Sequence, residues 1–376
     1  MKAGWTINTL GNTCDMYQPK TISCKEMVQD GTYPVFGANG IIGRYDQYNH
    51  EEPQLLITCR GATCGSINIS EPFSWITGNA MVIRPKQEGI DIRFLEYILR
   101  GGINISEAIT GAAQPQITRT NLSPLKISYP TSLIEQQRIV AILDEAFEAI
   151  AVARANAEQN RQNARALFES YLQSVFSQRG EGWIETTIGD MCTLKSGTSV
   201  NVSLEKPTGD LAYVKVSDMS HAGNETEIYS SSRFLNMCDV GKNAIFPVGT
   251  TIFPKRGGAI LTNKKRLTAV PICADLNIMG VIPPDSLSSQ LLYYYFLNVD
   301  MKRLGSGSSI PQINNYDIAP LMLSFPENKE QQYKLVKNID ALHKETQRLE
   351  SLYQSKITAL DELKQSLLQQ AFSGQL

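Results

Sequence analysis

Two long stretches of the chain have the hydrophobic pattern of extended helices. Residues 135–178 and 329–372 contain neither glycine nor proline. In the first stretch, apolar or small side chains recur every three or four residues with one wider gap, at Ile139, Leu143, Ala146, Ile150, Ala153, Ala157, Ala164, Leu167 and Tyr171. In the second stretch they recur at Leu335, Ile339, Leu342, Leu349, Tyr353, Leu360 and Leu367. This near-heptad spacing predicts helices that pack along a seam.

The length of these helices suggests what they pack against. A helix of forty residues is roughly 60 Å long, which is more than one small domain can cover. We expect the two helices to pair with each other in antiparallel orientation. The alternative is a helix docked on its own domain or on another protein, but the matching lengths of the two stretches favour the intramolecular pair.

Each long helix follows a region with the pattern of a mixed globular domain. Short β-like runs at 55–58, 80–83, 211–216 and 250–253 are separated by glycine, proline and asparagine. We predict an α+β fold with two similar globular domains, joined by two long antiparallel coiled-coil helices and related by an internal pseudo-two-fold repeat. The predicted boundaries are 1–132 for the first domain, 133–179 for the first helix, 180–327 for the second domain and 328–376 for the second helix.

An internal repeat is the strongest signal in the sequence. Gly4-Trp5, Leu10-Gly11 and Cys14 correspond to Gly182-Trp183, Ile188-Gly189 and Cys192 at an offset of 178, whereas later blocks recur at an offset near 196. The second copy therefore carries about eighteen extra residues. The stretches 111–130 and 307–326 share eight of twenty residues, and Glu135-Gln136-Gln137 matches Glu330-Gln331-Gln332. The halves have diverged but share one plan.

Composition narrows the class of protein. The chain has 376 residues, enough for two domains, and a formal net charge of −2, which argues against coating DNA by bulk attraction. It contains no run of eighteen apolar residues, and its first ten residues lack the order of a signal peptide, so we expect no membrane association and a cytoplasmic location. The seven cysteines form no C-x-x-C pair and are expected to be free thiols rather than zinc ligands.

Motifs of the common enzyme classes are missing. The sequence contains no [ND]-P-P-[YF] tetrapeptide of an amino-methyltransferase, no phosphate-binding G-x-x-x-x-G-K-[ST] loop and no G-x-S-x-G nucleophile elbow. The three histidines are isolated, and the carboxylates show no obvious pairing. We therefore expect a non-catalytic chain without a metal or a cofactor of its own.

The clearest basic feature lies in the second half. Residues 242–274 contain six basic residues and no acidic one. Five cations crowd into twelve positions with an asparagine beside them: Lys255, Arg256, Asn263, Lys264, Lys265 and Arg266. A turn that carries cations can lie against phosphates, and arginine or asparagine can reach base edges. The alternative is a solvated basic loop without a ligand.

The repeat adds further candidates for DNA contact. Arg60-Gly61 corresponds to Arg256-Gly257, and both pairs follow a β-like run. Gln116 and Gln312 share a Pro-Gln-Ile turn, and glutamine can bond adenine through two hydrogen bonds. Two residues of a polar, glycine-rich loop in the first half, Asn39 and Arg44, complete the set. The alternative for the Arg-Gly and Pro-Gln-Ile pairs is a purely structural bend.

These segments resemble a known family. YPVFGANGIIGRYDQY at 33–48, LLITCRGATCGSI at 55–67 and WITGNAMVIRP at 75–85 are similar to the target-recognition domain of Type I restriction–modification specificity subunits. FPKRGGAILTNKKR at 253–266 and DLNIMGVIPP at 275–284 resemble the same domain in the second half. The Glu-Gln-Gln that begins each long helix resembles the start of that family's inter-domain helices. The resemblance covers essentially the whole chain.

The resemblance implies a division of labour. Each globular half would read one part of a split, asymmetric target in double-stranded DNA, and the paired helices would fix the gap between the half-sites. Two methyltransferase subunits using S-adenosylmethionine, and motor/endonuclease subunits using ATP and Mg, would supply the chemistry. Two alternatives remain open from the residues alone. One is a coiled-coil protein-interaction adaptor without DNA specificity, and the other is an enzyme with an unfamiliar site.

Overall fold

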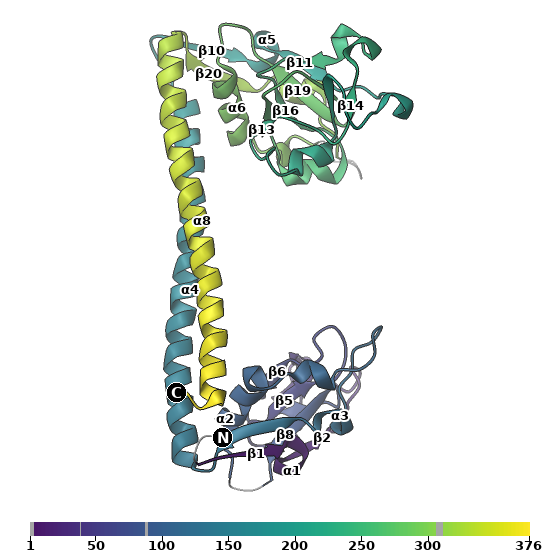
Figure 1. The fold of residues 1–376 in the computed structure, drawn as a ribbon, viewed down its shortest axis with the longest axis vertical. Helices are drawn as coiled ribbons and strands as arrows, with labels where there is room; N and C mark the ends of the chain where they lie inside the picture. Colours follow the sequence, from purple (N-terminus) through teal and green to yellow (C-terminus); the bar gives the residue numbers. More distant parts are fainter. Residues whose placement is uncertain (1–3, 38, 87–88, 306–310) are drawn as a thin grey trace. The chain divides into compact units, whose positions relative to one another are not determined.

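The computed structural model describes residues 4–37, 39–86, 89–305 and 311–376. The chain forms two compact units, each of which contains one globular domain and parts of both long helices (Figure 1). Unit 1 comprises Met1–Glu158 with Gln354–Leu376, and unit 2 comprises Gln159–Tyr353. The long helices are α4 (Leu133–Phe176) and α8 (Lys329–Ser373), so each helix begins in one unit and ends in the other. The predicted α+β architecture of two similar domains and two long helices is confirmed.

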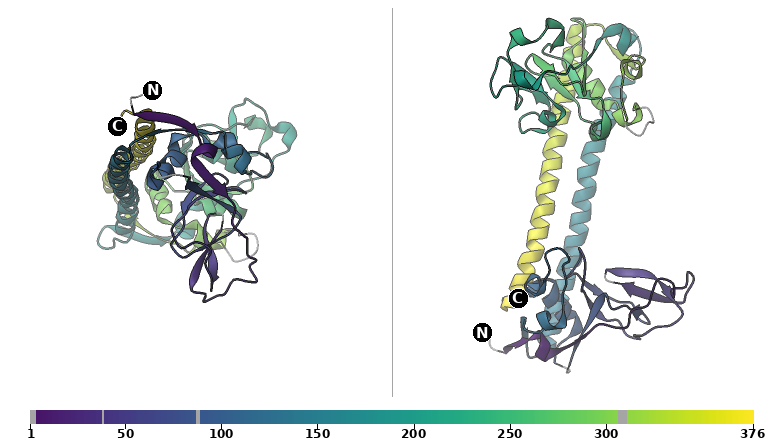
Figure 2. Two further views of the ribbon diagram at one scale, coloured as in Figure 1. Left: turned by 90° about the horizontal axis from the view of Figure 1, so that it is seen from below. Right: turned by 90° about the vertical axis from the view of Figure 1, so that its right-hand side faces the viewer.

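The domain of unit 1 is built on three small sheets (Figure 2). β1 (Trp5–Thr9) pairs antiparallel with β9 (Lys126–Pro130), the strand that leads into α4. The four-stranded sheet has the order β2 (Cys14–Tyr17), β8 (Ala80–Pro85), β5 (Leu55–Thr58) and β6 (Ile67–Ile69), and the three-stranded sheet has the order β4 (Gly40–Tyr45), β3 (Tyr33–Gly37) and β7 (Trp75–Ile76). Short helices complete the domain: α1 (Leu10–Thr13), α2 (Ile92–Tyr97), which continues as helical turns to Gly102, a turn at Ile105–Ala108, and α3 (Arg119–Leu122).

The domain of unit 2 repeats this plan with larger sheets. β10 (Trp183–Thr187) pairs with β20 (Met322–Pro326) in the register of β1 and β9. The five-stranded sheet has the order β11 (Thr193–Ser196), β19 (Ile278–Ile282), β16 (Thr251–Pro254), β17 (Arg266–Thr268) and β13 (Glu227–Ile228). The four-stranded sheet has the order β14 (Phe234–Leu235), β12 (Leu211–Val214), β18 (Ile272–Ala274) and β15 (Ile245–Phe246). The α-helices are α5 (Ile188–Met191), α6 (Ser289–Asn298) and α7 (Asn315–Ile318).

A buried glutamine ties each long helix to the domain that precedes it. The amide of Gln136 donates to the carbonyls of Gly89 and Pro130 at 3.0 and 2.8 Å and accepts from the Asp91 N–H at 2.7 Å. Gln332 makes the same three bonds at the start of α8, to Ser286, Pro326 and Ser288. The two glutamines are 196 residues apart. The match of Glu135–Gln137 with Glu330–Gln332 is therefore wrong by one residue, because Gln136 corresponds to Gln332 in position and bonding.

Each long helix ends in the core of the other unit. Phe176, at the end of α4, packs edge-on against Tyr295 in unit 2, with ring centroids 5.5 Å apart. Phe372, near the end of α8, packs in the same way on Phe94 in unit 1 at 5.6 Å. The main hydrophobic cluster of each unit therefore combines residues of both long helices with residues of its globular domain.

The helices run antiparallel within each unit. In unit 1 Arg138 of α4 donates to the Leu376 carbonyl and Arg154 to Asp361, and in unit 2 Arg165 donates to Glu350. The predicted seam of α4 is buried at five of nine positions, whereas Leu167 is exposed. In α8 only Ile339 of the seven predicted positions is fully buried. The buried residues there are Gln332, Val336, Ile339, Thr346, Ile357, Leu368 and Ala371. Seven- and eleven-residue intervals separate Ile339, Thr346, Ile357 and Leu368, since a helix of 3.6 residues per turn drifts away from a strict heptad.

Candidate nucleic-acid interface

The repeated Arg-Gly and Pro-Gln-Ile segments meet in the first domain. Beyond the end of β5, Arg60 forms an isolated antiparallel bridge with Gln116, although 55 positions of sequence lie between them. The Gly61 N–H donates to the Pro115 carbonyl at 3.1 Å, and the Ile117 N–H donates to the Cys59 carbonyl at 2.9 Å. Gly61 has φ +88°, a left-handed conformation that favours glycine and turns the chain after Arg60.

The second domain repeats this bridge. Arg256, beyond the end of β16, pairs with Gln312. The Gly257 N–H donates to the Pro311 carbonyl at 2.8 Å, and the Ile313 N–H donates to the Lys255 carbonyl at 2.9 Å. Gly257 is also left-handed, at φ +65°. Two motifs that the sequence connects only by their recurrence are therefore neighbours in both domains.

The side chains of the first pair are available to a ligand. Arg60 and Gln116 are both exposed, and neither the guanidinium nor the side-chain amide makes a hydrogen bond or ion pair with any residue that the structure describes. With Gly61, Gln114 and Pro115 they line a shallow depression of about 420 Å³. An uncompensated guanidinium beside a free amide can donate to and accept from a polar partner.

In the second pair the arginine is free and the glutamine is held. Arg256 is exposed and makes no hydrogen bond or ion pair within the described part of the chain. Gln312 is half-buried, and its Nε2 donates to Asn314 Oδ1 at 2.6 Å. Asn314 in turn donates from Nδ2 to the Tyr316 hydroxyl at 2.9 Å. This chain of bonds fixes the amide of Gln312, and its Oε1 bonds none of the residues that the structure describes.

Lys255 and Lys265 do not form part of an exposed basic surface at 255–266. Lys255 is 8% exposed and donates to the Ser196 hydroxyl at 2.7 Å. Lys265 is 2% exposed and donates to Asn263 Oδ1 at 2.8 Å and to the Val299 carbonyl at 2.7 Å. The Val299 carbonyl lies at the C-terminal end of α6, where the helix dipole favours a cation. Both ammonium groups therefore bind within the domain rather than at its surface.

The neighbouring residues also turn inward. Arg266 donates to the carbonyls of Met219, Asn224 and Lys265. Asn263 adopts a left-handed conformation at φ +53°, and its Oδ1 also accepts from the Met301 N–H. Lys264 is half-buried and donates to the Ser220 hydroxyl. Of the five cations in this segment, Arg256 alone is exposed and makes no hydrogen bond or ion pair with another described residue.

Of the two candidates on the β3–β4 hairpin, one is bonded within the domain and the other is exposed. Arg44 donates to the carbonyls of Gly31 and Thr32, so its guanidinium holds the preceding loop against β4. Asn39 is exposed in the turn beside Gly40, whose φ is +115°. Asn39 therefore remains a candidate for contact with a ligand, whereas Arg44 has a local structural role.

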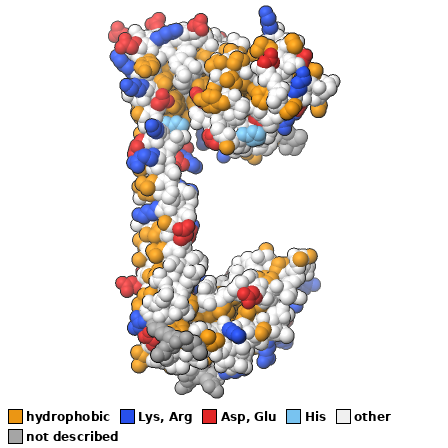
Figure 3. Space-filling view, viewed as in Figure 1, with side chains coloured by type: hydrophobic (Ala, Val, Ile, Leu, Met, Phe, Trp, Pro, Cys, Tyr) orange, Lys and Arg blue, Asp and Glu red, His pale blue; other side chains and the backbone are white. Residues whose placement is uncertain are grey.

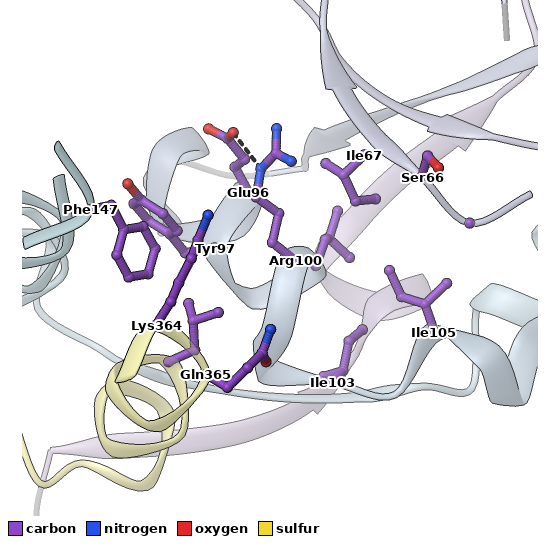
Figure 4. Close-up of a pocket in the computed structure, with 13 residues that line it drawn as sticks. Ser66, Ile67, Glu96, Tyr97, Arg100, Ile103, Ile105, Phe147, Lys364 and Gln365 are labelled. Atoms are coloured by element: carbon purple, nitrogen blue, oxygen red, sulfur yellow. Dashed lines mark hydrogen bonds and ion pairs between the residues drawn. The ribbon is translucent and has the colours of Figure 1, made fainter. Parts of the chain in front are cut away.

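A feature that the sequence did not indicate is a polar cavity of about 630 Å³ in unit 1, where the domain meets the long helices (Figure 4). Glu96 is buried in it and accepts from Arg93 and Arg100. Lys364 of α8 lies over the Phe147 ring of α4, with Nζ 5.0 Å from the ring centroid. Glu96 and Lys364 therefore already have partners inside unit 1, and we interpret the cavity as a structural contact between the domain and the long helices.

No other chemical centre emerges from the described residues. All seven cysteines are free, and four of them are buried. Within residues 4–37, 39–86, 89–305 and 311–376, no group of three His, Cys, Asp or Glu side chains is placed to hold a metal ion. In the same ranges no helix is long and apolar enough to cross a bilayer. Basic and acidic side chains are interspersed on the face shown in Figure 3.

The burial of Lys265 makes a testable contribution to stability. Desolvation lowers the pKa of its ammonium from 10.5 to about 8 in the folded protein. Between these values the unfolded chain binds more protons than the folded one, so this residue makes stability rise with pH from about 8 to 10.5. We expect the unfolding free energy of the native protein, minus that of Lys265→Met, to rise by up to about 3 kcal/mol across this window.

Urea denaturation of both proteins at several pH values measures this difference. Taking the difference between them cancels the ionisation of thiols and phenols, which affects both proteins equally. Lys264→Met is the matched control because it makes the same chemical change at the neighbouring lysine, which is half-buried rather than fully buried. A wild-type minus Lys265→Met difference that stays flat from pH 8 to 10.5 would contradict a buried, partly desolvated ammonium.

Comparison with known proteins finds the same family in both halves of the chain. A family model described as the Type I restriction modification DNA specificity domain matches residues 2–159 and again residues 180–359. The specificity subunit of the Type I restriction enzyme EcoprrI from Escherichia coli is 31% identical over 141 residues, which are 36% of this chain and 34% of that protein. The specificity subunit of MjaIX from Methanocaldococcus jannaschii is 24% identical over 160 residues, 40% of this chain and 35% of that protein. These matches span about a third of either relative.

Solved structures share the whole fold. A chain from a study of complex assembly and conformational transition of the type I R-M system superposes with a TM-score of 0.81 at 17% identity, covering 100% of this chain and 99% of that one. The HsdS subunit from Thermoanaerobacter tengcongensis gives 0.61 at 18% identity, covering 100% and 98%. At such low identity the likeness concerns the fold.

Proposed function

The chain belongs to the Type I restriction–modification DNA specificity family, and on that premise we propose that it reads a split, asymmetric target in double-stranded DNA. The supporting observation is the bridged Arg–Gln pair, which recurs in the two domains and carries in both an exposed guanidinium that bonds none of the described residues. Arginine and glutamine are side chains that read base edges in the major groove. Because the two domains have diverged around this pair, each would read a different half-site.

The proposal extends to partner subunits. Two methyltransferase subunits would bind this chain and transfer a methyl group from S-adenosylmethionine to adenine N6, and motor/endonuclease subunits would use ATP and Mg. This chain would contribute recognition without a catalytic step. A near-neutral net charge fits such sharing, because the partners can supply part of the attraction for phosphates. The complex would act in the cytoplasm, where it meets DNA.

The paired segments of α4 and α8 suggest how the gap between half-sites is set. Antiparallel packing within each unit, with ion pairs at Arg154–Asp361 and Arg165–Glu350, makes both segments parts of a helical pair. We infer that this pair acts as the spacer of the two reading domains. Half-site spacing in duplicated DNA readers follows the geometry of the protein that links them.

Single-molecule sequencing of the host genome for N6-methyladenine tests the proposal, with the gene intact, deleted and restored. We expect one split, asymmetric motif to be methylated in the intact and restored strains and unmethylated in the deletion strain. The DNA-reading function is wrong if the methylated motifs are the same in all three strains although the intact and restored strains contain the complex. Copurification of methyltransferase subunits with the tagged chain establishes that the complex is present.

A further inference from the structure

The repeated glutamines of this chain fall into two physical classes. Gln136 and Gln332 are 0% and 1% exposed, and the oxygen and nitrogen of each amide are bonded inside the protein. Gln136 and Gln332 recur because each satisfies the backbone groups that hold a long helix to its domain. Gln116 is exposed, and neither its amide nor Gln312 Oε1 bonds a residue in the described part of the chain, so neither satisfies a buried group there. The recurrence of an available glutamine beside an available arginine therefore points to a ligand.

The bridge sets the distance between the two side chains. Residues that face each other across an antiparallel bridge project to the same side, with Cβ atoms roughly 5 Å apart. Stacked bases along one DNA strand are about 3.4 Å apart. This Cβ separation lies between one and two base steps, so the flexible Arg and Gln side chains can reach two neighbouring base pairs.

The chemistry of each side chain selects a base. A guanidinium donates two parallel hydrogen bonds to guanine O6 and N7, and a carboxamide donates to adenine N7 and accepts from N6. In the second domain the bond from Gln312 Nε2 to Asn314 assigns the amide orientation and leaves Oε1 and the second amide hydrogen for that pairing. No carboxylate bonds either arginine among the described residues, so neither must break an ion pair to reach a base.

We propose that each Arg–Gln pair reads a guanine and a neighbouring adenine, so that the two half-sites contain the same two adjacent base pairs although they differ elsewhere. This inference rests on the proposed function and assigns a specificity role to Arg60 with Gln116 and to Arg256 with Gln312. The surrounding residues, which differ between the domains, supply the remaining positions of each half-site.

The test uses the complete complex in host cells and reads the methylated motif of variants. Arg60→Lys keeps the positive charge but loses the two-pronged geometry. We expect Arg60→Lys to lower discrimination for guanine at one position of one half-site by about tenfold, with the other half-site unchanged. Gln116→Ala should relax the adjacent A·T position of the same half-site, and Arg256→Lys and Gln312→Ala should do the same in the other.

Arg119→Lys is the matched control, because Arg119 is an exposed arginine near Gln116 whose counterpart in the repeat is Asn315. It should leave every base preference intact. If Arg60→Lys behaves like this control while the wild-type motif is present, the pair does not read bases and the inference is overturned, although the proposed function stands. A wild-type motif whose half-sites share no adjacent G·C and A·T pairs overturns it as well. Absence of any motif overturns both proposals.

Discussion

Replacing Gln136 by leucine should lower the free energy of unfolding by about 3 kcal/mol. The substitution keeps the approximate volume but removes three hydrogen bonds, and the Gly89 and Pro130 carbonyls and the Asp91 N–H lose their partner. Each buried polar group left without a partner costs roughly 1–3 kcal/mol. The Gln332→Leu variant should lose a similar amount, since Gln332 makes the corresponding three bonds.

Equilibrium urea unfolding of the full chain measures this loss. Gln116→Leu is the matched control, because the same chemical change then falls on an exposed amide and should alter stability by less than about 0.5 kcal/mol. The pair of measurements separates a structural glutamine from a surface one. Equal effects at positions 116 and 136 would mean that the buried bonds do not hold α4 to its domain.

Phe253→Ala should destabilise the second domain by about 4 kcal/mol. Phe253 lies in β16, is fully buried and stacks on Phe296 of α6 with ring centroids 5.6 Å apart. Truncation of a buried phenylalanine removes apolar contacts and leaves a cavity, which together cost roughly 3–5 kcal/mol. Because β16 leads directly to Arg256, the variant should also weaken reading of one half-site.

Urea denaturation again provides the measurement, with Leu261→Ala as the control. Leu261 lies eight residues further along the same segment and is 59% exposed, so its truncation should cost less than about 1 kcal/mol. A Phe253→Ala variant as stable as Leu261→Ala would show that the β16–α6 contact is not part of the stabilising core. A methylation motif unchanged despite a large loss of stability would separate folding from positioning of Arg256.

The fold was predictable because it is encoded locally and twice. Absence of glycine and proline over more than forty residues predicts the long helices, and the recurrence of motifs predicts equivalent domains. The seam of α8 was predicted less well. An apolar residue at the right interval, such as Leu349, is only half-buried, whereas the polar Thr346 is buried and bonds the Leu342 carbonyl at 3.0 Å. Which residues of α8 are buried depends on how the helix face drifts at 3.6 residues per turn, and a strict heptad pattern does not include that drift.

The candidate site was predictable only in part. Recurrence singled out Arg60, Arg256, Gln116 and Gln312, but no sequence pattern indicated that they bridge in pairs. Counting cations overestimated the exposed positive charge of residues 255–266, because composition does not show whether a side chain points outward or inward. Lys265 turns inward to the end of α6, a contact between residues 34 positions apart that depends on the tertiary fold. Exposure, rather than basic composition, distinguishes Arg256 from its neighbours.

Each long helix begins in one unit and ends in the other, and this has a consequence for the order in which the two units fold during translation. The main core of unit 1 includes Leu368 and Ala371, so the domain that leaves the ribosome first must wait for residues 354–376. Unit 2 is one continuous stretch, Gln159–Tyr353, and all its contacts are available before that segment is translated. Contacts between distant parts of a chain form slowly because a long loop must close first. The first domain synthesised is therefore the last to be completed, and during translation its surface for Phe372 stays open.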